Sequence, residues 1–381
     1  MRLLTLLWLA GLLTCSAAHA TTELHPSRGD DVVERLPTIT RVRPIAPNAS
    51  APAQPADPVA AAAQARAHIA TARQSGDTRY WGRAQAVLGP WWNQPNAPAE
   101  LAILQATVQQ GRHEFAASRS VLQAALKRDP GSAQGWLNLA ALERLSGQYP
   151  QALLACNAVA RAGQNMYAQA CVLETQSLQG QNTAVRSGLT ALLAQTRDAG
   201  QRSWLLSLLA ESEERAGHDA AAQAAYRSSL HSEPDLYTSI ALSDLLLRTG
   251  KPAQALAVLK PLPLTDAVLL RQATALRRLK DPSWQALRQT IREWNTELAQ
   301  RGDDLTLHGR EQALVALWLD DDAAGALAIA RRNLHLQREP VDWWVALQSA
   351  RQAGDAAALQ QLQADMRGIG LVDARSVKGA T

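Results

Sequence analysis

The sequence predicts an all-α protein, a right-handed solenoid of about nine helical hairpins stacked side by side. Apolar residues recur at the i, i+3, i+4 and i+7 spacing of one helix face. The chain is rich in Ala, Leu, Gln and Arg, which favour helices, and its Val and Ile residues rarely alternate as they would in a strand. A period near 34 residues is typical of helical repeats that bury their apolar faces against one another. Such a period is set by Gly76, Gly111, Gly147, Gly180, Gly217 and Gly250, at intervals of 35, 36, 33, 37 and 33 residues.

The segment 133–164 shows the repeating unit most clearly. Gly147 ends its first helix, because glycine adopts the left-handed C-cap conformation without penalty. Pro150 opens the second helix at a first-turn position, where no hydrogen bond is lost. The small residues Ala140 and Ala152 allow the two helices to pack closely. The inward face of the first helix carries Trp136, Leu139, Ala140 and Glu143.

This unit resembles the tetratricopeptide repeat. Four of the spaced glycines are followed five residues later by an alanine, as in that family. The resemblance implies a superhelix whose concave groove is lined by the first helix of each hairpin and binds a protein or peptide. The matching residues of the central unit are Trp136, Leu139, Ala140, Gly147, Tyr149, Ala152 and Val159.

The chain starts with the pattern of a secretory signal peptide. A basic start precedes the apolar run 3–13, which is too short to span a membrane. Residues 18–20 read Ala-His-Ala, so residues 1–20 are predicted to be removed after Ala20. Cys15 leaves open a lipoprotein signal, although the preceding Thr fits that pattern poorly.

Residues 21–57 are rich in Pro and Ala and lack a periodic apolar face, which predicts a disordered linker that serves as a spacer or a docking segment. The solenoid is predicted to span residues 58–370, and residues 371–381 to form a flexible tail. The expected hairpins pair 58–75 with 79–90, 98–111 with 113–128, 133–146 with 149–162, 165–179 with 182–197, 201–216 with 219–232, 236–249 with 252–261, 265–279 with 283–301, 303–319 with 322–336, and 341–353 with 355–368.

Catalytic and cofactor motifs are missing from the sequence. The eight histidines show no metal-binding spacing, and we find no nucleophile elbow, phosphate loop or dinucleotide fingerprint. We therefore expect no enzyme activity, no metal and no cofactor. A net charge of +4 without a concentrated basic surface argues against nucleic acid as a partner. The dipeptide Glu211–Ser212 resembles a motif of lytic transglycosylases, which leaves one alternative: a helical accessory domain of a peptidoglycan-acting enzyme.

Cys156 and Cys171 are the two cysteines that remain after signal removal, and they are candidates for a disulfide. An exported protein meets an oxidising compartment. The midpoint between the two residues falls in the turn that follows Gly163, so antiparallel helices would bring both to the same height. Packed helices usually lie 8–10 Å apart, whereas bridged Cα atoms need about 4.4–6.8 Å. Two buried thiols therefore remain an equal alternative.

The tetratricopeptide resemblance also implies which side chains line the groove. They make its middle acidic, with apolar and aromatic patches, which would suit a basic partner segment. The unit after Gly163 has an ambiguous register, so no residue is carried over there. The implied groove residues are Gln134, Leu137, Arg144, Trp204, Glu211, Glu214, Tyr237 and Asp244.

We therefore expect a non-catalytic scaffold or adaptor that is periplasmic or secreted and binds a partner protein or peptide in its concave groove. An association with a complex of the bacterial cell envelope would fit this location. No segment of the mature chain is predicted to span a membrane. A structural spacer of the envelope without a discrete partner is a further alternative.

Overall fold

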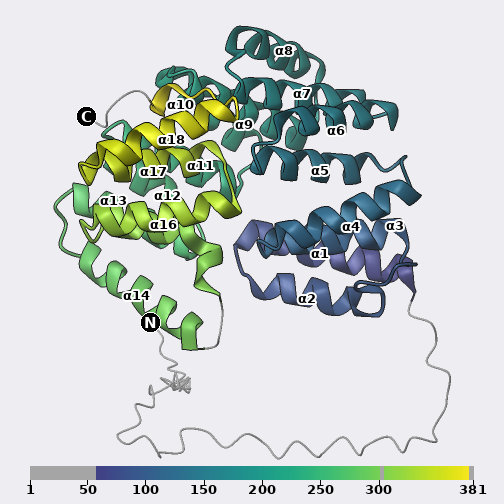
Figure 1. The fold of residues 1–381 in the computed structure, drawn as a ribbon, viewed down its shortest axis with the longest axis horizontal. Coiled ribbons are helices and arrows are strands. Elements are labelled where there is room, and N and C mark those ends of the chain that lie inside the picture. Colours follow the sequence, from purple (N-terminus) through teal and green to yellow (C-terminus); the bar gives the residue numbers. More distant parts are fainter. Residues whose placement is uncertain (1–56, 301–303, 377–381) are drawn as a thin grey trace, which may run out of the picture. The chain divides into compact units, whose positions relative to one another are not determined.

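The structure, a computed structural model, describes residues 57–300 and 304–376. Within these ranges it contains eighteen α-helices, three short 3-10 helices and no strand (Figure 1). The predicted fold class, an α-solenoid of nine helical hairpins, is confirmed. The predicted signal peptide 1–20 and almost all of the predicted linker 21–57 lie outside the described residues.

The helices follow one another as antiparallel pairs, and their bounds lie close to the predicted ones. Two differences are the 3-10 turn η1 (Gly89–Trp91) after the second helix and the turn η2 (Leu305–His308), which replaces the start of a longer predicted helix. The pairs are α1 (Pro58–Ser75) with α2 (Arg79–Leu88), α3 (Ala99–Gly111) with α4 (Phe115–Arg128), α5 (Ala133–Leu145) with α6 (Tyr149–Arg161), α7 (Asn165–Leu178) with α8 (Asn182–Gln195), α9 (Ala199–Arg215) with α10 (Asp219–Ser232), α11 (Leu236–Arg248) with α12 (Pro252–Leu259), α13 (Asp266–Arg278) with α14 (Trp284–Gln300), α15 (Gly309–Trp318) with α16 (Ala323–Leu336), and α17 (Pro340–Gln352) with α18 (Ala356–Gly368).

One backbone motif closes seven of the nine hairpins, all but the first and the eighth. In the central turn, the N–H of Gly147 donates to the carbonyl of Arg144 and the N–H of Gln148 to that of Glu143. This is the Schellman motif, which requires a residue in the left-handed conformation just after the helix. Across the nine hairpins that residue is Gly76, His113, Gly147, Gly180, Gly217, Gly250, Lys280, Asp321 and Gly354.

Gly111 is not the turn residue that its place in the glycine series suggested. It is the last residue of α3, and His113 adopts the left-handed conformation instead, with φ 62°. A glycine is needed at 111 for another reason. A Cβ atom there would lie 2.5 Å from the indole ring of Trp81 on α2.

The core runs along the facing sides of consecutive helices. Ala140 and Ala152, predicted to allow close packing, are both fully buried between α5 and α6. Tyr149 and Tyr226 are the largest fully buried side chains. Tyr149 is the first residue of α6, and Tyr226 lies within α10. Within the described ranges, no helix has the length and apolar character needed to cross a bilayer.

Cys156 on α6 and Cys171 on α7 are joined by a disulfide in the structure, with their Cα atoms 5.5 Å apart. Both residues are buried. The bridge therefore ties two consecutive hairpins at a point where their helices approach more closely than packed helices usually do.

The C-terminal hairpins contact the turns of hairpins far earlier in the chain. The N–H of Arg338 donates to the carbonyl of Leu145 at 2.7 Å, and the N–H of Val372 to that of Leu178 at 2.9 Å. The second contact holds the first part of the predicted tail 371–381, whose residues 377–381 lie outside the described residues. The segment Leu371–Ser376, which ends in the 3-10 turn η3 (Ala374–Ser376), is packed against α7 and α9 because Leu371, Asp373 and Ser376 are buried there.

Gly111→Ala should destabilise the fold by about 1–3 kcal/mol, since the new methyl group would overlap the Trp81 ring. Gly82→Ala is the matched control: Gly82 lies inside α2 with open space around it, so alanine should stabilise by roughly 0.5–1 kcal/mol. Urea unfolding measures both changes. Equal effects of the two substitutions would contradict the proposed contact with Trp81.

The mature protein isolated under oxidising conditions should contain no alkylatable thiol after denaturation, and two after reduction. Mass spectrometry with and without reductant measures this. Because the bridge closes a loop of 15 residues, its removal in a Cys156→Ala/Cys171→Ala variant should cost about 3 kcal/mol of unfolding free energy. Two free thiols in the oxidised protein would show that these cysteines are only buried hydrophobic residues.

Candidate functional site

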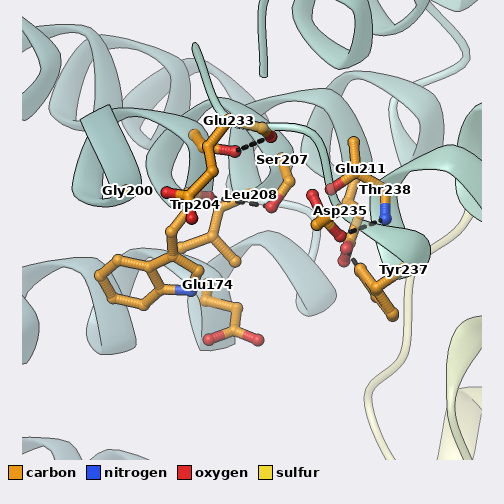
Figure 2. A pocket seen from close by; sticks show the side chains of 11 residues that line it. Glu174, Gly200, Trp204, Ser207, Leu208, Glu211, Glu233, Asp235, Tyr237 and Thr238 are labelled. Atoms are coloured by element: carbon orange, nitrogen blue, oxygen red, sulfur yellow. Dashed lines mark hydrogen bonds between the residues drawn. The ribbon is translucent and has the colours of Figure 1, made fainter. Parts of the chain in front are cut away.

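A pocket of about 360 Å³ lies on the first helices of the fourth, fifth and sixth hairpins (Figure 2). The helix α9 contributes most of its lining, because residues three and four apart point to the same side of a helix. The loop before α11 and the first turn of α11 close the opposite side. The lining residues are Glu174, Gly200, Ser203, Trp204, Ser207, Leu208, Glu211, Glu233, Asp235, Tyr237 and Thr238.

The pocket carries more acidic than basic side chains. Glu174 forms an ion pair with Arg144 of α5 at 2.7 Å. Glu211 is paired more loosely, with a distance of 3.5 Å to Arg215. Glu233 is exposed and Asp235 is half-buried, and neither has an ion pair with any residue that the structure describes. Four carboxylates thus face two arginines, which leaves the pocket with an excess of negative charge.

Two aromatic side chains stand on either side of these carboxylates (Figure 2). Trp204 packs against Tyr167 of α7, with ring centroids 5.6 Å apart. Tyr237 is 64% exposed, and its hydroxyl donates to Glu211 Oε1 at 2.7 Å. Aromatic faces attract cations, and more strongly where carboxylates are close.

The carboxyl of Glu211 lies in the most sheltered part of this surface. Burial raises its pKa above the ordinary glutamate value, while the Arg215 charge and the hydrogen bond from Tyr237 act in the opposite direction. Its negative charge is therefore lost at a higher pH than for an exposed glutamate. The charge of the pocket depends on pH through this residue.

Asp235 has a structural task besides lining the pocket. Its Oδ1 accepts the N–H of Thr238 at 2.8 Å and so caps the N-terminus of α11. The hydroxyls of Ser203 and Ser207 also serve the fold. Each donates to a backbone carbonyl, that of Glu233 for Ser203 and that of Trp204 for Ser207.

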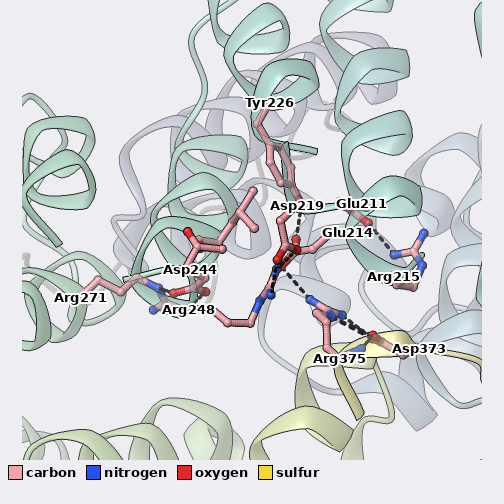
Figure 3. A network of polar contacts seen from close by, with 12 residues as sticks. Glu211, Glu214, Arg215, Asp219, Tyr226, Asp244, Arg248, Arg271, Asp373 and Arg375 are labelled. Atoms are coloured by element: carbon pink, nitrogen blue, oxygen red, sulfur yellow. Dashed lines mark hydrogen bonds and ion pairs between the residues drawn. The ribbon is translucent and has the colours of Figure 1, made fainter. Parts of the chain in front are cut away.

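Two of the implied groove acids do not face the pocket. Glu214 is buried and bonded to three groups: Arg248 at 3.1 Å, Tyr226 Oη at 3.1 Å, and Arg375 at 3.1 Å (Figure 3). Asp244 forms a two-point ion pair with Arg271 at 2.7 and 2.8 Å. Both carboxylates are thus engaged within the chain, so reversing their charges would disturb the fold as well as any partner.

The remaining implied residues lie on α5, to one side of the pocket. Gln134 donates to Asn138 Oδ1 at 2.8 Å, and Leu137 is half-buried against the core of the second and third hairpins. Arg144 reaches the pocket through its ion pair with Glu174. Of the eight residues implied by the sequence, the structure brings Trp204, Glu211 and Tyr237 into one pocket.

Sequence reasoning missed Glu174, Glu233 and Asp235. Glu174 lies in the repeat whose register was ambiguous, so no position could be carried over to it. Glu233 and Asp235 belong to the connection between two hairpins, which the resemblance treats as a loop. The Asp at the start of a predicted helix was the one available clue, since Asp is a favoured N-cap residue. Among the described residues, no group of three or more His, Cys, Asp or Glu side chains is placed to hold a metal ion.

Comparison with known proteins identifies no family. No family model matches the chain, and no curated protein matches it. Solved structures with a similar arrangement include a Rap protein complexed with competence and sporulation factor, with TM-score 0.49 and 10% identity over 81% of this chain and 84% of that one. The human IFIT1 dimer with PPP-AAAA has TM-score 0.45 and 12% identity over 77% and 69%. A structure of Naa15/Naa10 bound to HypK-THB has TM-score 0.30 and 14% identity, covering 81% of this chain but 46% of that one. The sequence identities and TM-scores are too low for the role of any of these three proteins to be transferred to this chain.

Proposed function

We propose that this protein is a non-catalytic scaffold whose pocket between α7, α9 and α11 binds a basic segment of a partner protein. The observation that carries the proposal is the composition of the pocket. It combines two aromatic side chains with four carboxylates, of which Glu233 and Asp235 have no internal ion pair among the described residues. Lysine and arginine side chains match both features, since their charge suits the carboxylates and their stems or planar heads suit aromatic faces.

A binding role fits this pocket better than a catalytic one. The side chains that line it include no His, Cys or Lys, and the two serine hydroxyls are bonded to backbone carbonyls. No serine there has a base within hydrogen-bond reach, which nucleophilic catalysis requires. The exposed Tyr237 ring offers the kind of aromatic contact that is enriched at binding hot spots.

We further propose that the scaffold works outside the cytoplasm, in the periplasm, as part of the cell envelope. The order of a basic start, an apolar run and Ala18-His19-Ala20 supports this location. A disulfide between Cys156 and Cys171 also fits an oxidising compartment.

Neutralising the pocket should weaken its attraction for a cationic peptide. A fluorescent peptide with an Arg-Ala-Arg core should bind the Glu211→Gln/Glu233→Gln variant about tenfold more weakly at low salt, with a smaller difference at high salt. Glu297→Gln, an exposed site on α14, is a control with the same kind of charge change. Fluorescence anisotropy measures the affinities. Equal binding by the double variant and the control would place the binding surface elsewhere.

The same interaction should depend on pH through Glu211. Because burial raises the pKa of this carboxyl, its charge is lost as the pH falls through a range above that of an ordinary glutamate. The affinity for the peptide should fall as this charge is lost. The Glu211→Gln variant should not show that fall in affinity. Anisotropy titrations across this pH range test the expectation. An identical pH profile for the variant would mean that Glu211 does not contact the peptide.

Export should remove residues 1–20, so that the mature protein starts at Thr21 in the periplasmic fraction. Intact mass and N-terminal sequencing measure this. Ala20→Tyr should leave the precursor uncut, because the cleavage site needs small residues. A full-length product in the cytoplasm would contradict export, and a lipid-bearing product that starts at Cys15 would show the lipoprotein alternative.

A further inference from the structure

The C-terminal segment Leu371–Ser376 lies where the resemblance implied an open groove. We infer that the inner face of α9 carries two adjacent subsites for an extended basic segment of the partner, and that the chain's own C-terminal turn occupies one of them. The first subsite is the pocket at Glu211, and the second is Glu214, which now holds Arg375. This inference rests on the proposed function, whose partner it specifies.

The C-terminal segment is held on this face by few polar contacts. The Arg375 guanidinium pairs with Glu214 at 3.1 Å (Figure 3). The N–H of Val372 donates to the carbonyl of Leu178. Arg351 donates to the carbonyl of Ser376. Val372 itself is 51% exposed. Leu371 anchors the start of the segment in the core, and release of the turn after it would expose mainly polar side chains, those of Asp373, Arg375 and Ser376.

The exchange leaves neither Arg375 nor Glu214 without a partner. Arg375 has a second partner inside its own turn, because its Nε donates to Asp373 Oδ1 at 2.9 Å. It therefore carries its counter-ion with it when it leaves. Glu214 keeps Arg248 and the Tyr226 hydroxyl. Breaking a buried pair is strongly destabilising when one charge stays behind alone, and here neither does.

The spacing of the two acids defines the partner segment. Glu211 and Glu214 are three residues apart on one helix, so their Cβ atoms lie about 5–6 Å apart. Side chains at i and i+2 of an extended chain are separated by roughly 7 Å and point to the same side. An extended segment with two basic residues separated by one residue can therefore reach both acids. Arginine is favoured at the second subsite, because a guanidinium already fits there and is more easily desolvated than an ammonium.

Removing Arg375 should open the second subsite. The Arg375→Gln variant should bind the Arg-Ala-Arg peptide about tenfold more tightly than the unaltered protein, because an occupied site lowers apparent affinity by the fraction of open molecules. The same substitution should raise the affinity for a peptide with a single arginine by a smaller factor. The double variant Asp373→Asn/Arg375→Gln removes both members of the ion pair within the turn. It should bind the peptide as tightly as Arg375→Gln does. Arg367→Gln, exposed on α18, is the control for the loss of one positive charge.

Hydrogen exchange on the unaltered protein gives a second readout that needs no substitution. The amide of Val372 is bonded to Leu178, so peptide binding should speed exchange in the segment 371–376. Unchanged or slower exchange there, or affinities of both variants that match Arg367→Gln, would overturn the inference while the proposed function stands. A failure of every variant and of the unaltered protein to bind basic peptides would instead reject the proposed function.

Discussion

The packing around α9 depends on the ion pairs and the hydrogen bond that the buried carboxylate of Glu214 makes. A charge removed from water is tolerated only when it is paired and hydrogen-bonded. Glu214 meets that demand with groups from three parts of the chain: Tyr226 on α10, Arg248 on α11 and Arg375 in the C-terminal turn. The last of these is more than 150 residues away in sequence. One carboxylate thereby links the fifth and sixth hairpins to the end of the chain.

That link decides how much of the inner surface is open to a partner. A solenoid is stabilised mainly by contacts between neighbouring repeats, so its concave side is expected to be free. Here the turns of early hairpins meet the last hairpins directly, through Arg338 with Leu145 and Val372 with Leu178. The pocket at Trp204 and Tyr237 is an opening on α9 that these contacts leave uncovered.

The hairpin turns show where a sequence pattern stops being sufficient. Six of the nine left-handed turn residues are glycines, and the repeat could be recognised from them. His113, Lys280 and Asp321 adopt the same conformation, although it is less favourable for residues with a Cβ atom. The turns at those three places could therefore not be recognised from a glycine. At Gly111, by contrast, a glycine is required by the Trp81 ring and not by the turn.

The sequence by itself determined the all-α class, the number of hairpins and nearly all helix ends, because helix periodicity, proline and glycine act within a few residues of one another. The repeat register also predicted Trp204, Glu211 and Tyr237 to lie on one face, and in the structure all three line the same pocket. Tertiary structure alone decided that Glu214 and Asp244 are bound within the chain, that Glu174, Glu233 and Asp235 complete the pocket, and that Leu371–Ser376 is packed. Those outcomes depend on contacts between side chains of different helices, which the periodicity within one helix does not encode.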